Sequence, residues 1–304
     1  MECYRRLQLG AHEESGPGPG PAGDEETSDP VGSGAGISRL LPLRDQGYPS
    51  NKCWRLILRV ASQEGNTMFK KPAPRDAQRL VDDHVLRWEQ GQKKRAGGEA
   101  SEPWPLVTVS REFGALGTVT GERAAQKLGF SFWDQEIVHA IAEQTGIQET
   151  LLASLDEQSR SRIEDFIAES VFGAGTTAAK YVRQVIRVVR TIERHGGAVV
   201  IGRGAQFILA PEAALRVRVV CPYEQRVAGY AKREGLSEGE AERKLARVER
   251  ERQTFIQRHY DRNVGDPTHY DVMLNTENLL PDQAADVLVA AYRSKFGRLP
   301  EGAG

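Results

Sequence analysis

The stretch Leu106-Val-Thr-Val-Ser-Arg-Glu-Phe-Gly-Ala-Leu-Gly-Thr-Val-Thr-Gly-Glu-Arg-Ala-Ala-Gln-Lys-Leu-Gly129 decides the fold. Its pattern predicts a short buried strand, a glycine-containing turn and an amphipathic helix, in that order. After a parallel strand, Gly114 and Gly117 permit a backbone that points successive N–H groups at one anion, and the dipole of the next helix supports that anion. The other interpretation is a tight turn that binds nothing.

Polar side chains around this turn add to the predicted anion site. Ser110, Thr118 and Thr120 carry hydroxyls that can touch phosphate or magnesium, and Arg111 stands beside the first of them. The phosphate-binding pattern GxxxxGK[ST] is absent, and no lysine occupies the turn.

Composition limits the classes of function. The chain has 304 residues and a formal net charge of -1, so no overall field recruits nucleic acid or anionic lipid. Its three cysteines, Cys3, Cys53 and Cys221, are far apart and form no CxxC pair. They argue against a disulfide framework and a zinc site and suit a reducing compartment. No apolar run reaches the roughly 18 residues of a membrane span, and no secretory signal is evident. We therefore expect a soluble cytoplasmic protein.

The N-terminal third differs in composition from the rest. Residues 1–67 include a Gly/Pro/Ser/Glu/Asp tract and predict a disordered extension. One hypothesis is that translation starts at Met68, and the alternative is that residues 1–67 are a genuine disordered tail. Residues 68–103 predict a short helix over Asp76–Gln92 and a polar linker from Gln92 onward.

The folded domain is predicted over residues 104–297, followed by a C-terminal tail over 298–304. Short apolar segments, typical of strands buried in a parallel sheet, alternate with helical segments, which favours an α/β fold. The predicted strands are 106–110, 131–133, 198–202, 215–221 and 271–276. The predicted helices are 119–128, 135–144, 163–171, 177–195, 223–234, 238–262 and 281–296. The apolar stripe of 177–195 fits either intramolecular core or a subunit surface, so the oligomeric state stays open.

A Gly-Arg-Gly unit follows the third predicted strand. It places Arg203 at the carboxyl end of that strand, where ligands bind in open α/β sheets. An arginine fork there suits phosphate or carboxylate. The other interpretation is an arginine that holds a loop carboxylate.

The long helix over 238–262, opened by a capping box of Ser237 and Glu240, is rich in arginine. At about 100° per residue, Arg252 falls in the apolar stripe, so it needs an anion. That anion is either a ligand or Glu249, three residues earlier.

Six blocks of sequence occur in an order that resembles the cytidylate kinase-like family. The resemblance covers about residues 104–297 and rests on Val107-Thr-Val-Ser-Arg-Glu-Phe-Gly114, Lys127-Leu-Gly-Phe130, Phe132-Trp-Asp134, Ile201-Gly-Arg-Gly-Ala205, Glu249-x-x-Arg-x-x-Phe255 and Gly265-Asp-Pro-x-x-Tyr-Asp271.

The resemblance implies a three-layer P-loop kinase fold with a five-stranded parallel sheet and an arginine-rich helical lid. It implies transfer of the γ-phosphoryl group of ATP, with Mg²⁺ carried by the nucleotide, to CMP, dCMP or another small phosphate acceptor. The implied ATP phosphate site is Ser110, Arg111, Gly114, Gly117, Thr118 and Thr120. Asp134 and Arg203 would line the acceptor site, and Arg247, Arg250 and Arg252 would approach the transferred group.

The chain also departs from that family. Leu116 replaces a glycine, Thr118 replaces a basic residue, and Gly204 stands where cytidylate kinases have an aspartate. These differences favour, as the alternative, a catalytically weak or inactive nucleotide-binding regulatory relative that keeps the fold and the anion pocket.

Overall fold

The computed structural model describes residues 74–96, 102–170, 177–300 and 302–303. Every described residue belongs to the second of the two units into which the chain divides, Pro49–Gly304. The predicted disordered extension over residues 1–67 and the alternative start at Met68 lie outside the described residues.

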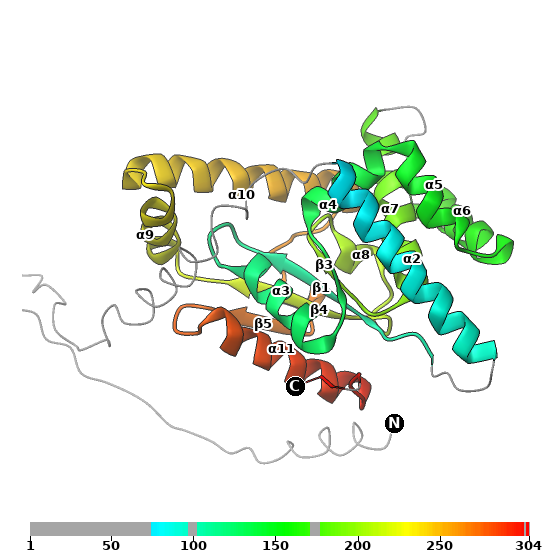
Figure 1. The fold of residues 1–304 in the computed structure, drawn as a ribbon. Helices are drawn as coiled ribbons and strands as arrows, with labels where there is room; N and C mark the ends of the chain where they lie inside the picture. Colours follow the sequence, from blue (N-terminus) through cyan, green and yellow to red (C-terminus); the bar gives the residue numbers. More distant parts are fainter. Residues whose placement is uncertain (1–73, 97–101, 171–176, 301, 304) are drawn as a thin grey trace, which may run out of the picture. The chain divides into compact units, whose positions relative to one another are not determined.

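A five-stranded parallel sheet organises the second unit (Figure 1). In the order β2-β3-β1-β4-β5, β1 is central and pairs with β3 on one side and β4 on the other. All six residues of β1 are buried, as its apolar sequence predicts. The strands are β1 (Leu106–Arg111), β2 (Ser131–Trp133), β3 (Ala198–Ile201), β4 (Ala214–Val220) and β5 (Val272–Asn275). Each observed end lies within one residue of its predicted position.

Helices cover both faces of the sheet, because alternate residues of each strand point to opposite sides. Val199 and Ile201 pack in the cluster that also holds residues of α3 (Gly117–Leu128) and α11 (Pro281–Phe296). These two helices lie side by side along that face (Figure 1). Ala198 and Val200 belong to the cluster of the opposite face. The predicted three-layer α/β fold is therefore confirmed.

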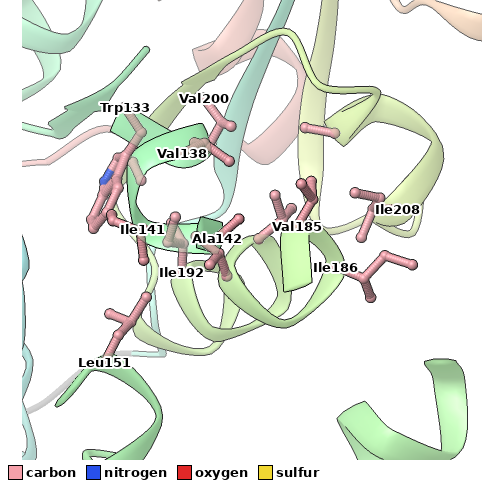
Figure 2. Packing of buried hydrophobic residues seen from close by; sticks show 14 of the residues in the cluster. Trp133, Val138, Ile141, Ala142, Leu151, Val185, Ile186, Ile192, Val200 and Ile208 are labelled. Atoms are coloured by element: carbon pink, nitrogen blue, oxygen red, sulfur yellow. The ribbon is translucent and has the colours of Figure 1, made fainter. Parts of the chain in front are cut away.

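Four helices separate β2 from β3: α4 (Gln135–Glu143), α5 (Thr145–Ala153), α6 (Glu157–Ser170) and α7 (Thr177–His195). We call them the insert. Their apolar residues pack with the sheet in one buried cluster. Figure 2 shows part of this cluster and labels, among others, Trp133, Val138, Ile141, Leu151, Val185, Ile192 and Val200. The stripe of α7 therefore contributes to the core of the chain itself.

The prediction missed α5 and began α6 six residues late. The apolar residues of α5 span less than two helical turns, and Gly146 stands near its start, so its sequence gives only a weak helix signal. Only its packing reveals it, since Ile147 and Leu151 are buried against the rest of the insert.

The N-terminal helix α2 (Pro74–Ala96) contributes Ala77 and Val81 to the same cluster. It continues through Gln92–Ala96, so the predicted start of the polar linker at Gln92 is wrong. Glutamine, lysine, arginine and alanine all favour helix, which accounts for the longer extent.

The remaining helices follow β3 and β4, and some of them surround the candidate site. After β3 comes the short helix α8 (Ala205–Ile208), which was not predicted. After β4, α9 (Tyr223–Glu234) leads into α10 (Glu238–Tyr260), the arginine-rich helix, which ends two residues before the predicted end. Its predicted capping box of Ser237 and Glu240 is confirmed. A 3₁₀ turn, η1 (Pro267–His269), precedes β5.

Candidate functional site

The turn between β1 and α3 is held by its neighbours. Gly114 has a left-handed φ of 87°, and Leu116 caps α3 with a φ of 58°. Arg226 Nη1 donates to the carbonyl of Phe113 at 3.1 Å, and Thr276 Oγ1 donates to that of Ala115 at 2.9 Å. These bonds fix the path of the backbone on which the predicted phosphate site depends.

The start of α3 has little space for side chains. A Cβ atom at Gly117 would lie 2.5 Å from Cβ of Arg111 and 3.0 Å from Cβ of Val219, so the position admits only glycine. Thr120 is fully buried, and its hydroxyl has no hydrogen-bond partner among the described residues. Thr118 is half-buried. Of the predicted hydroxyls near α3, only that of Thr118 is open to a ligand.

A cavity of about 370 Å³ lies at the carboxyl end of the sheet, and four arginines line it. Arg111 comes from the end of β1, Arg203 follows β3, Arg218 belongs to β4, and Arg252 belongs to α10. We call it the arginine cavity. The rest of its lining is Ser110, Glu112, Gln135, Glu136, Gly202, Gly204, Gln206, Val248, Glu249, Glu251, Gln253, Phe255, Ile256 and Val264.

Arg111 is buried, with 9% of its surface exposed. Its Nη2 donates to Oε1 of Gln135 at 2.8 Å, and its Nε has no partner among the described residues. Burial and, next, the positive charge of Arg252 lower the pKa of its guanidinium well below the ordinary value. The charge of Arg111 is thus poorly compensated by the protein.

Arg252 points inward from α10. Its Nη1 donates to the main-chain carbonyl of Arg111 at 3.2 Å, and its guanidinium lies 5.5 Å from the centre of the Phe113 ring. Burial lowers its pKa to about 10, although Glu249 opposes that shift. Glu249 itself is ion-paired with Arg226, so it is not the partner of Arg252.

Arg203 sits between two glycines, and all three residues are left-handed, with φ values of 74°, 54° and 73°. A Cβ at Gly202 would collide with Nη1 of Arg111, and one at Gly204 with the ring of Tyr260. Arg203 Nε donates to the carbonyl of Gln135 at 3.3 Å. Gly204 therefore makes room for the ring of the partly buried Tyr260, which explains why no aspartate stands there.

Arg218 and Gln135 are two cavity residues that sequence reasoning missed. Arg218 Nη1 donates to Oγ of Ser110 at 2.9 Å, and Tyr270 donates to the same hydroxyl at 3.3 Å. A sequence signal existed for Arg218, because an arginine within a strand buried on both faces needs a polar destination. Gln135 carries no such signal.

None of the four arginines forms an ion pair within 4 Å in the part of the chain that the structure describes. Two acids of the lining, Glu112 and Glu249, are paired with Arg226 instead. The cavity thus collects four guanidinium groups from four separate segments, and none of its four glutamates, Glu112, Glu136, Glu249 and Glu251, pairs with one of them within 4 Å. Such a site can bind a phosphate or another multiply charged anion.

The other predicted residues lie outside the lining. Arg247 and Arg250 are exposed on α10. Asp134 is the N-cap of α4 and accepts from the main-chain N–H groups of Glu136 and Ile137 at 2.9 and 2.8 Å. Burial raises its pKa, against those hydrogen bonds. The structure does not bring these three residues together, and their roles stay predictions.

Within the described ranges, no group of three or more His, Cys, Asp or Glu residues could hold a metal ion. In the same part of the chain, no helix has the length and apolar character of a membrane span.

Comparison with known proteins identifies a family and individual proteins that this chain resembles. Residues 106–278 match the cytidylate kinase-like family. The uronate isomerase of Corynebacterium glutamicum is 29% identical over 119 residues, which cover 39% of this chain and 23% of that protein, about a quarter of its length. An uncharacterized protein from Eubacterium ventriosum ATCC 27560, of known structure, has a TM-score of 0.47 and 16% identity, with 62% of this chain and 99% of that chain covered.

Proposed function

The chain belongs to the cytidylate kinase-like family and has a kinase-like fold, and on that premise we propose that it is a phosphotransferase. It transfers the γ-phosphoryl group of ATP to a small phosphate acceptor such as CMP or dCMP. The observation that carries the proposal is the arginine cavity, in which four guanidinium groups meet without an acidic partner among the described residues.

The free-energy cost of burying these charges favours an anionic ligand in the cavity. Removing one charged group from water costs several kcal/mol even after the protein relaxes. Arg111 bears much of that cost with a single neutral side-chain partner, Gln135. A phosphate bound between the arginines would offset it through charge-assisted hydrogen bonds. Phosphoryl transfer needs mainly this positioning and charge stabilisation, so the same groups suit the reaction.

In this proposal, the arginine cavity holds the phosphate of the acceptor or the group in transfer, and the turn at 110–120 faces the ATP phosphates. In the same proposal, Asp134 and Arg203 bind the acceptor, and Arg247 and Arg250, exposed on α10, approach the transferred group together with Arg252. Ser110 is already bonded to Arg218 and Tyr270, so it orients Arg218.

In this proposal, Mg²⁺ binds as a complex with the nucleotide and not at a metal site of the chain. Mg²⁺ prefers oxygen ligands and keeps several waters, and the half-buried hydroxyl of Thr118 at the start of α3 fits that requirement. The ion would neutralise charge on the phosphates. The chain itself would bind and orient the two phosphate groups.

We place the protein in the cytoplasm, on the strength of its three widely spaced cysteines. We assign the activity to a domain over residues 104–297, preceded by a helix and linker over 68–103 and the extension over 1–67, and followed by the tail over 298–304.

A regulatory nucleotide-binding protein is the second candidate, and one observation favours it. Thr118, at the start of α3, replaces the basic residue of the family pattern. A chain without that charge can bind nucleotide and still transfer phosphate slowly or not at all.

The test is a coupled ADP-release assay with ATP–Mg²⁺ and a panel of nucleoside monophosphates, alongside calorimetry of the same ligands. Turnover on a monophosphate that is lost in Arg252→Ala supports the enzyme. Binding without turnover on any acceptor supports the regulatory protein. Absence of binding by any phosphate compound refutes both.

A further inference from the structure

The positive charge that the turn lacks has a source close by. Gly117 cannot carry a side chain, because Cβ of Arg111 already occupies the space beside it. The same Arg111 sends its guanidinium across the end of β3, where Gly202 leaves room for Nη1. Arg111 therefore packs against the start of α3 and also brings a cation into the cavity.

Gln135 determines where that guanidinium points. Its side-chain Oε1 accepts from Nη2 of Arg111 at 2.8 Å, and its main-chain carbonyl accepts from Nε of Arg203 at 3.3 Å. Its own Nε2 donates to Glu136 at 3.1 Å, which fixes the orientation of the amide. Because Gln135 is the first residue of α4, it links two of the four arginines to the insert.

Resting on the proposed function, we propose that Arg111 contacts the phosphate of the ligand, and that Gln135 is a positioning residue that orients Arg111 without cancelling its charge. The neutral amide matters here. A carboxylate in the same place would bind Arg111 more tightly and remove it from the ligand. An apolar side chain would leave Arg111 without its side-chain acceptor.

Gln135→Glu separates this role from a structural one, because stability and affinity change in opposite directions. The new carboxylate pairs with Arg111, so the melting temperature rises. The ligand loses one charge-assisted partner, so inorganic pyrophosphate binds about 10- to 100-fold more weakly by calorimetry. If Gln135 only stabilises the fold, the melting temperature changes and the affinity does not.

A matched control is Gln126→Glu on α3. Gln126 also accepts from an arginine, since Arg123 Nη1 donates to its Oε1 at 3.1 Å, but it is exposed and lies outside the cavity lining. It makes the same change of net charge, and we expect pyrophosphate affinity within about twofold of the unmodified protein.

Gln135→Met is the second variant, for the case in which Gln135→Glu does not fold. It removes the acceptor without adding charge, and we expect about threefold to tenfold weaker binding with no gain in melting temperature. If the unmodified protein binds pyrophosphate and the folded Gln135 variants bind it equally well, the role of Gln135 is refuted and the proposed function stands. If the unmodified protein binds neither pyrophosphate nor any nucleoside monophosphate, the proposed function fails, and this inference fails with it.

Discussion

Replacing Arg111 by methionine should stabilise the fold and weaken phosphate binding. Arg111 is buried, has no acidic partner within 4 Å among the described residues, and has a buried Nε without a hydrogen bond. Methionine is unbranched and flexible, so it can follow the stem of Arg111 through the same space. The substitution removes the charge and keeps most of the apolar packing.

The magnitude follows from two opposing contributions. The hydrogen bond from Arg111 to Gln135 is lost, which costs about 1 kcal/mol. The desolvation of a buried guanidinium, several kcal/mol, is relieved. We therefore expect the free energy of unfolding to increase by about 2 kcal/mol, and the melting temperature of a domain of this size to rise by about 4–8 °C.

Arg226→Met is the matched comparison. Arg226 is equally buried, but it is paired with Glu112 and Glu249 and donates to the carbonyls of Phe113 and Cys221. Its loss leaves buried acceptors and charges unpaired, so we expect destabilisation by about 3–5 kcal/mol. Chemical denaturation of both variants gives the free energies, and pyrophosphate calorimetry gives the affinity. If Arg111→Met lowers stability by more than about 1 kcal/mol, Arg111 is a structural residue and the reasoning is refuted.

Three further outcomes are expected. Gly204→Ala should cost about 3 kcal/mol or more in urea denaturation, because its φ is 73° and the ring of Tyr260 fills the space beside it. Gly235→Ala, with a φ of 68° and open space around it, should cost about 1 kcal/mol, and equal losses would contradict the steric account. Burial, together with the charge of the neighbouring His195, lowers the pKa of His84 to about 3. Burial alone lowers the pKa of His195 to about 4. The unfolded chain then binds more protons than the folded chain between about pH 4 and 6.5, so the free energy of unfolding should fall as pH drops through that window, by up to about 2.7 kcal/mol per pH unit. His84→Leu should reduce this slope in denaturation measured at a series of pH values, and an unchanged slope would contradict the role of His84. Arg252→Ala should lower kcat/KM for a monophosphate acceptor about 100-fold in the ADP-release assay, and a loss of less than about threefold would exclude Arg252 from the site.

Most of the sheet can be predicted from the sequence because its strands are short, apolar on both faces and bounded by turn residues. Ser131–Trp133 and the helices over 177–195, 223–234 and 281–296 have the predicted ends. Helix α5 could not be predicted, because its formation depends on burying Ile147 and Leu151 against the other helices of the insert. The extent of α2 was misjudged because charged residues suggested a linker, although they favour helix.

The site was only partly accessible to sequence reasoning. The apolar stripe of α10 indicated that Arg252 points inward, and the Gly-Arg-Gly unit indicated that Arg203 lies at a strand end; both line the cavity. Gln135 and Arg218 are separated from Arg111 and Ser110 along the chain, and only the parallel pairing of strands brings them together. The pairing of Glu249 with Arg226 rather than Arg252 also depends on how α9 packs against α10.

The most direct test is a crystal structure of the protein with CMP or inorganic pyrophosphate bound. The account predicts phosphate oxygens within about 3 Å of guanidinium nitrogens of Arg111 and at least one other cavity arginine, with Gln135 still bonded to Arg111. A phosphate bound elsewhere, with Arg203 and Arg252 turned onto carboxylates and the cavity closed, would contradict it.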